Sequence, residues 1–147
     1  MAIEKTSDIS RNRLLQDIMD YSPALIFTVD IGGCFISVNA QFAALFGKKP
    51  DNFVGKDRKT FIPAAISRQQ HETDMQVIKA SRSLTFEEKT EEQDGIHYYS
   101  TVKFPMKDEN GKIYGITGIS TDITERKIGE KALHENEEKY RNLCRFF

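Results

Sequence analysis

Three strand-like runs in the second half of the chain are separated by two strong hairpin signals. Residues 83–92, 97–106 and 112–121 are rich in β-branched and aromatic side chains, and Asp94-Gly95 and Asn110-Gly111 stand between them. Such pairs supply the positive φ angles of a tight turn between antiparallel strands. The chain is therefore expected to fold these three runs into one antiparallel sheet.

The first half adds a second hairpin and the helices. Residues 24–30 and 34–39 read as strands around the turn at Ile31-Gly32-Gly33. Ser10, Asn39 and Pro63 are placed to begin helices, because Ser and Asn cap helix starts and Pro suits the first turn. The order of elements predicts an α+β domain, with helices on one face of a five-stranded sheet.

The composition fits one globular domain. The chain has 147 residues, 39% of them hydrophobic and 29% charged, with a formal net charge of −1. Without a basic field, nucleic acid is not expected as a partner. No apolar run approaches the ~20 residues of a membrane-spanning helix, so this segment is expected to be cytoplasmic and to make no membrane contact, even if the parent protein is membrane-anchored. Cys34 and Cys144 are expected to be free thiols, because neither has metal-ligand spacing.

A charged, helix-forming tail follows residue 123. The expected division is a flanking helix over residues 1–22, a core domain over 23–124, and a connector helix over 125–147. The last residues, ENEEKYRNLCRFF, echo the segment that leads into the first strand. The chain is therefore expected to be one module of a longer protein, with the connector leading towards a further domain.

Two separated segments resemble the PAS sensory-domain family. They are YSPALIFTVDIGGCFISVNAQFAALFG at residues 21–47 and HYYSTVKFPMKDENGKIYGITGISTDITERK at residues 97–127. The resemblance covers roughly residues 12–127. It implies strand order 2-1-5-4-3, a ligand site between sheet and helices, and a signal relay at Asp122 and Thr124.

The resemblance also bears on cofactors, of which none is required. The flavin-binding branch needs an Asn-Cys-Arg-Phe-Leu-Gln run, whereas the matching VGKDRKTFIP (54–63) has no cysteine, so flavin is not expected. The haem branch uses a His on the long helix, and His71 stands near that place. Haem ligation by His71 is the weaker alternative to an ordinary rim or capping His, and no other metal site is predicted.

Strand parity and the family pattern together suggest which side chains face a ligand. The predicted pocket residues are Phe27, Val29, Phe42, His71, Met75, Tyr99, Thr101, Gly118 and Ser120. A filled core without ligand would use the same residues, so both interpretations stay open. The acidic run at 87–92 is interpreted as a solvated sheet edge. No catalytic triad, Cys–His pair or phosphate-binding glycine loop is found, so the segment is not expected to be an enzyme.

The leading functional hypothesis is a regulatory sensor that binds a small ligand or partner and relays the change through its C-terminal helix to an output domain in the same parent. The alternative is a ligand-free dimerisation or interaction module, and a homodimer is expected. The resemblance suggests a parent such as a two-component sensor histidine kinase or a cyclic-dinucleotide enzyme.

Overall fold

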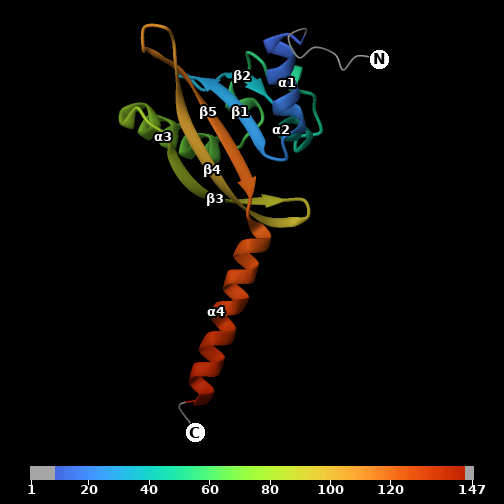
Figure 1. The fold of residues 1–147 in the computed structure, drawn as a ribbon, viewed down its shortest axis with the longest axis vertical. Coiled ribbons are helices and arrows are strands. Elements are labelled where there is room, and N and C mark those ends of the chain that lie inside the picture. Colours follow the sequence, from blue (N-terminus) through green and yellow to red (C-terminus); the bar gives the residue numbers. More distant parts are fainter. Residues whose placement is uncertain (1–8, 145–147) are drawn as a thin grey trace.

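The five predicted strands form one antiparallel sheet. The computed structural model describes residues 9–144. Its helices and strands are, in chain order, α1 (Arg11–Tyr21), β1 (Leu25–Asp30), β2 (Phe35–Val38), α2 (Ala40–Ala44), α3 (Ala64–Ala80), β3 (Leu84–Glu92), β4 (Gly95–Lys107), β5 (Ile113–Asp122) and α4 (Thr124–Cys144), with short 3₁₀ turns at Pro50–Asn52 and Arg58–Thr60. The sheet order is β2-β1-β5-β4-β3 (Figure 1). The predicted α+β class and strand order are confirmed.

The first and last strands lie side by side in the middle of the sheet, although 82 residues stand between the end of β1 at Asp30 and the start of β5 at Ile113. β1 pairs with β5 in a register that places Phe27 opposite Gly118. The Phe27 ring lies over Gly118, where any Cβ would collide with it. A glycine at this position therefore lets the bulky ring approach the sheet closely.

Asn39 joins the N-terminal elements. Its Oδ1 accepts hydrogen bonds from the backbone N–H groups of Ile26 and Phe42, both at 3.0 Å. Its Nδ2 donates to the carbonyls of Met19 and Ala24, both at 2.8 Å. The side chain thus caps α2 and also ties α1 to β1. Because Asn39 is fully buried, its amide cannot bond to water, and these four hydrogen bonds satisfy it instead.

The core lies between the sheet and the helices α2 and α3. Phe35 and Phe53 meet edge to face, with ring centroids 5.5 Å apart and an interplanar angle of 86°. The Phe42 ring packs against both, with ring centroids 5.7 Å from each. Such tilted contacts suit the aromatic quadrupole and add to the burial of apolar surface. Val29 and Ile116 complete this core from the sheet side.

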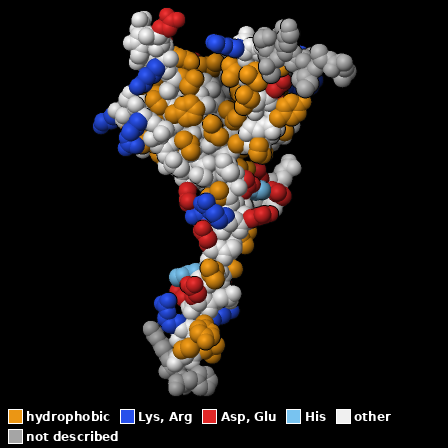
Figure 2. All heavy atoms as spheres, viewed as in Figure 1, with side chains coloured by type: hydrophobic (Ala, Val, Ile, Leu, Met, Phe, Trp, Pro, Cys, Tyr) orange, Lys and Arg blue, Asp and Glu red, His pale blue; other side chains and the backbone are white. Residues whose placement is uncertain are grey.

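Two helices lie outside the core. Helix α1 sits beside α2 near β2, and α4 projects away from the sheet (Figure 1). Neither helix buries a residue. Figure 2 shows hydrophobic side chains gathered over the sheet domain, while α4 carries mixed charged and hydrophobic groups. Within residues 9–144, no helix is long and apolar enough to cross a membrane.

Candidate functional site

A hollow of about 870 Å³ opens between α2, the sheet and the β3–β4 hairpin. Its apolar wall comes from Phe27 on β1 and from Phe42 and Phe46 in and after α2. Tyr99 of β4 and Ser120 of β5 supply polar groups. An apolar hollow of this size with a few polar groups has the usual character of a small-molecule site.

The rim of this hollow is acidic. Glu88, Glu91 and Glu92 of β3 line it together with Asp94 of the turn. No Lys, Arg or His is among the described residues that line it. We call it the acidic hollow. Carboxylates of one sign around a partly enclosed space concentrate a negative potential there. The arrangement favours neutral or positively charged groups over anions.

Hydrogen bonds fix the polar residues of the acidic hollow. The Tyr99 hydroxyl donates to Glu92 Oε2 at 2.7 Å, and the Thr90 hydroxyl donates to the same oxygen at 2.8 Å. Burial, and then the Glu92 carboxylate, raise the pKa of Tyr99 well above its ordinary value. Thr101 and Ser120 share a buried hydrogen bond of 2.7 Å beneath the hollow. These polar groups are therefore held in place before any ligand arrives.

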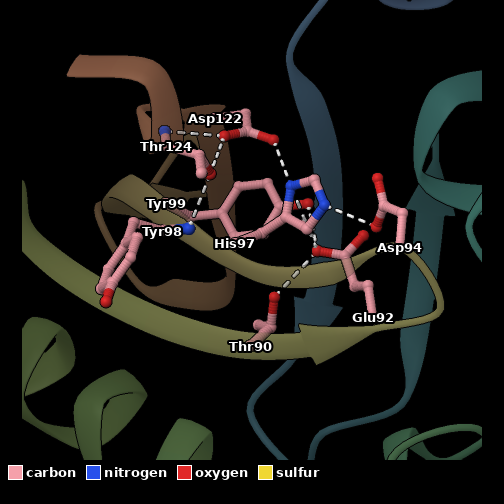
Figure 3. A network of polar contacts seen from close by, with 8 residues as sticks. All are labelled: Thr90, Glu92, Asp94, His97, Tyr98, Tyr99, Asp122 and Thr124. Carbon is pink, nitrogen blue, oxygen red and sulfur yellow. Dashed lines mark hydrogen bonds and ion pairs between the residues drawn. The ribbon is translucent and has the colours of Figure 1, made fainter. Parts of the chain in front are cut away.

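His97 lies next to this rim and joins it to the end of the sheet (Figure 3). Its Nδ1 is 2.7 Å from Asp122 Oδ2, and its Nε2 is 2.7 Å from Asp94 Oδ1. Glu92 lies 3.8 Å from Nδ1. The hydrogen bonds to Asp122 and then Asp94 raise the pKa of His97 to about 9. At neutral pH the ring is therefore a cation that donates to a carboxylate on each side.

Asp122 continues the network into α4. Its Oδ1 accepts from the Thr124 backbone N–H at 2.9 Å and from the Thr124 hydroxyl. The Thr124 oxygen in turn accepts from the Tyr98 backbone N–H at 2.9 Å. Burial pushes the pKa of Asp122 upward, but the bonds from Thr124 and His97 outweigh it and lower the pKa. The two predicted relay residues thus fix the first turn of α4 to the sheet.

Glu92, Asp94 and His97 also lie close enough to suggest a metal site, since their ligand atoms fall within 4.8 Å of one another. A metal-bound imidazole needs a nitrogen lone pair. In this structure Nδ1 of His97 faces Asp122 and Nε2 faces Asp94, so each ring nitrogen already has a carboxylate partner. The cluster is therefore better described as an ion pair that closes the β3–β4 hairpin on β5.

A buried charged group lies behind the Phe27 ring. Asp74 of α3 accepts from Arg58 Nη2 at 2.7 Å and from Lys103 Nζ at 2.9 Å. All three side chains are almost fully buried. Lys103 Nζ also lies 6.0 Å from the centre of the Phe27 ring. This triad ties α3 to β4 and to the 3₁₀ turn at Arg58–Thr60.

The structure divides the predicted pocket residues into three groups. Phe27, Phe42, Tyr99 and Ser120 line the acidic hollow, whereas Val29, Thr101 and Gly118 lie behind that surface. His71 and Met75 lie elsewhere: Met75 is 45% exposed, and His71 is exposed and lines a second hollow. An iron bound to His71 would lie outside the acidic hollow. The ligand-binding roles stay predictions.

The rotation of α3 explains the third group. Ser67, Asp74 and Val77 are its buried residues, at positions i, i+7 and i+10 of one helical face. His71 and Met75 point away from that face. His71 and Met75 are four residues apart and so share a side of the helix, but the side that faces the sheet is the one that carries Asp74.

The sequence analysis assigned no role to His97. The missed signal was register. The pairing of β4 with β5 places Tyr99 opposite Asp122, the last residue of β5. His97, two positions before Tyr99, therefore lies on the same face of the sheet, just beyond the end of β5. The acidic run was likewise only partly interpreted, because Glu92 points to Tyr99 rather than to solvent.

Comparison with known proteins identifies the family. The model of the PAS fold matches residues 19–128. The chain belongs to the PAS family. This PAS domain is 32% identical over 125 residues to the aerobic respiration control sensor protein ArcB of Escherichia coli (strain K12). The match takes in 84% of this chain and 16% of ArcB, so the chain spans about a sixth of that relative. It is a sensory regulatory module, and PAS domains are generally non-catalytic.

Solved structures share the fold. The PAS domain of Bordetella pertussis BvgS matches with a TM-score of 0.66 at 22% identity, covering 88% of this chain and 98% of that one. The Vibrio cholerae VqmA–ligand–DNA complex matches with a TM-score of 0.68 at 21% identity, covering 86% of this chain and 58% of that one.

The VqmA match corrects the partner prediction, which excluded nucleic acid. A chain with this fold occurs in a receptor bound to DNA, so that exclusion is wrong. The prediction relied on the net charge of one domain. The charge of a PAS domain does not determine what a longer receptor binds, because other parts of that receptor can make the contact.

Proposed function

We propose that this PAS domain senses a small neutral or cationic molecule in the acidic hollow and passes the change to α4. The observation that carries the proposal is the unbroken series of contacts from the hollow to that helix. Asp94 lines the hollow and binds His97, His97 binds Asp122, and Asp122 holds Thr124 at the start of α4.

A ligand can act through these contacts only if it binds one arrangement better than another. A ligand donor that reached Glu92 would compete with the Tyr99 hydroxyl, which now donates to that carboxylate. A ligand cation near Asp94 would compete with His97. Either change alters the charge that holds His97 against Asp122. The first turn of α4 would then loosen or reorient.

The chemical class follows from the wall and the rim. The phenylalanine wall suits an aromatic or aliphatic body, and the carboxylates suit a hydrogen-bond donor or an amine at its end. A carboxylate ligand of the same shape would approach four acidic side chains without a cationic partner among the residues that line the hollow. We therefore expect amines to bind and their carboxylate counterparts to be rejected.

Two matched probes test the ligand proposal: tyramine and 4-hydroxyphenylacetate. Titration of the folded chain would be followed by amide NMR shifts and by thermal unfolding. We expect tyramine to shift amides of Tyr99 and Ser120 and to raise the melting temperature, with 4-hydroxyphenylacetate at least about tenfold weaker. Equal binding of the two probes, or preference for the carboxylate, would refute the charge selection. A broad neutral and cationic compound set that produced no saturable shift would refute ligand binding.

The relay is tested by His97→Gln in the same titrations. We expect the shifts of hollow residues to persist and those of Thr124 and Glu125 to disappear. His134→Gln is the matched control, since His134 is an exposed residue of α4 that contacts only Glu138 among the ion pairs of the described chain. Unchanged shifts at α4 in the His97 variant would show that the signal takes another route.

The same proposal retains the division into a flanking helix (1–22), a PAS core (23–124) and a connector (125–147) that passes the signal to an output domain. Residues 1–8 and 145–147 of this division lie outside the described part of the chain. Support comes from the lack of buried residues in α1 and α4. Limited proteolysis should release a stable fragment close to residues 23–124. If the protease cut within the sheet earlier than it cut within α1 or α4, that result would contradict this division.

A further inference from the structure

A second hollow, of about 340 Å³, lies at the N-terminal end of α3 and shares no lining residue with the acidic hollow. Its charged lining comprises Arg58, Lys59 and Arg68 against the single carboxylate of Asp57, with His71 beside them. We call it the basic hollow. Asp57 accepts from the Lys59 backbone N–H at 2.8 Å, so one of its oxygens already caps a 3₁₀ turn.

Arg58 gives this hollow an unsatisfied buried donor. The residue is only 2% exposed, and its Nη2 binds Asp74. Its Nη1 is buried and has no hydrogen-bond partner within the described residues 9–144. A buried donor without a partner is costly, and more so on a charged group. Arg58 thus lines the hollow and has one buried donor nitrogen, Nη1, without an acceptor.

The buried charges around Arg58 do not balance. Arg58 and Lys103 are two cations, and Asp74 is the one carboxylate that both of them bind. The other partners of Lys103 Nζ are neutral oxygens of Thr73 and Gln70. An uncompensated buried charge destabilises a fold unless an opposite charge lies near it. The triad therefore presents excess positive charge beside the basic hollow.

The start of α3 contributes in the same direction. Ala64, its first residue, lines the basic hollow. Pro63, at the cap position, makes no side-chain hydrogen bond to the helix. The first backbone N–H groups of this 17-residue helix thus lack a side-chain acceptor, and the positive end of the helix dipole faces the same region.

We propose that the basic hollow binds a small oxyanion of the phosphate class, either free or as the end group of a metabolite. Such an anion offsets the excess charge of the buried triad, offers an acceptor for Arg58, and lies at an uncapped helix start, where phosphate groups are bound favourably. Arg68 and Lys59, both exposed at the hollow, close around it. This site does not depend on ligand binding in the acidic hollow.

Inorganic phosphate is the first probe, titrated at constant ionic strength against chloride and monitored by amide NMR and thermal unfolding. We expect saturable shifts at Gly33, Ala64 and Ala65 and a higher melting temperature. Glycerol 3-phosphate is the second probe. Tighter binding of inorganic phosphate identifies the free ion as the ligand class, and tighter binding of the ester identifies a phosphorylated metabolite.

The test variant is Lys59→Gln/Arg68→Gln, which changes exposed residues and leaves the buried triad intact. The control is Lys79→Gln/Arg82→Gln, which removes two exposed cations near the other end of α3. We expect the test variant to bind phosphate about tenfold more weakly, because it loses charge-assisted hydrogen bonds, and the control to stay within about twofold. A melting temperature that rises with phosphate concentration without saturating would indicate a general salt effect and would overturn the proposal. An equal loss of phosphate stabilisation in the test and control variants would overturn it too.

Discussion

The acidic and basic hollows lie in one domain and share one helix, yet they carry opposite charge. Gln70 of α3 lines the acidic hollow, while the next residue, His71, lines the basic one. The acidic rim comes from an edge strand and its turn. The basic lining comes from a 3₁₀ turn and the start of α3. The comparison shows that a nearly neutral chain can form two hollows of opposite charge when acidic and basic side chains gather at the ends of different elements.

The buried triad forms the partition between them. Arg58 lines the basic hollow, and Lys103 lies behind the Phe27 ring of the acidic hollow. Asp74 binds both. The partition is charged rather than apolar, and Asp74 is its one carboxylate between two cations.

The largest effect is expected from Asp74→Asn, which removes the shared charge. Two buried cations would then face each other without a carboxylate, and the free energy of unfolding should fall by about 3–5 kcal/mol. Urea denaturation measures the change. Glu72→Gln is the control, because Glu72 is an exposed carboxylate on the same helix, and its effect should stay within about 0.5 kcal/mol. Equal effects of the two variants would break the account of a charged partition.

An intermediate effect is expected beneath the acidic hollow. Thr101→Val removes one partner of the buried Thr101–Ser120 hydrogen bond and leaves the Ser120 hydroxyl unsatisfied, at a cost of about 1–2 kcal/mol. Adding Ser120→Ala should recover part of that loss, because the double variant leaves no orphaned hydroxyl. A double-mutant cycle by urea denaturation measures the coupling. Strictly additive losses would mean that the two hydroxyls are satisfied independently.

The smallest effect is expected at the acidic rim and depends on pH. The ordinary pKa of histidine is about 6.5, and that of His97 in the fold is about 9, because Asp122 and Asp94 hold its charged form and Glu92 lies nearby. The folded state therefore binds this proton more tightly. Its stabilising contribution is fully present below about pH 6.5, declines as pH rises, and is lost above about pH 9.

Comparison of the wild type with His97→Gln by urea denaturation from pH 5.5 to 9.5 measures this contribution. The stability difference should be greatest at the acid end and should vanish near pH 9.5, whereas His134→Gln should differ little from wild type throughout. A difference that grows with pH would contradict the cationic state of His97.

Local sequence was sufficient for most of the fold. Asp94-Gly95 and Asn110-Gly111 stand where the β3–β4 and β4–β5 turns occur, and Ser10 and Asn39 cap helices as predicted. These features depend on neighbours a few residues apart, so pattern reasoning reaches them. The strand order came from the family resemblance, since no local pattern states that β1 lies beside β5.

The sites were predicted less completely, for a physical reason. Phe27, Phe42, Tyr99 and Ser120 share the inner face of the domain by strand parity or helix position, and they do line one hollow. The role of His97 could be assigned only from the pairing of β4 with β5. That pairing brings His97 to Asp122, 25 positions later in the chain, with which it forms an ion pair. Arg58 and Lys103 look like surface residues in the sequence, and only their contact with Asp74 accounts for their burial.

The sequence by itself determined the elements, their order and the turns, because hydrophobic periodicity and turn chemistry act over short distances. The tertiary structure alone decided the charge of each hollow. That charge depends on which strand ends and helix starts come together, and on one buried carboxylate that pairs with cations 16 and 29 residues away.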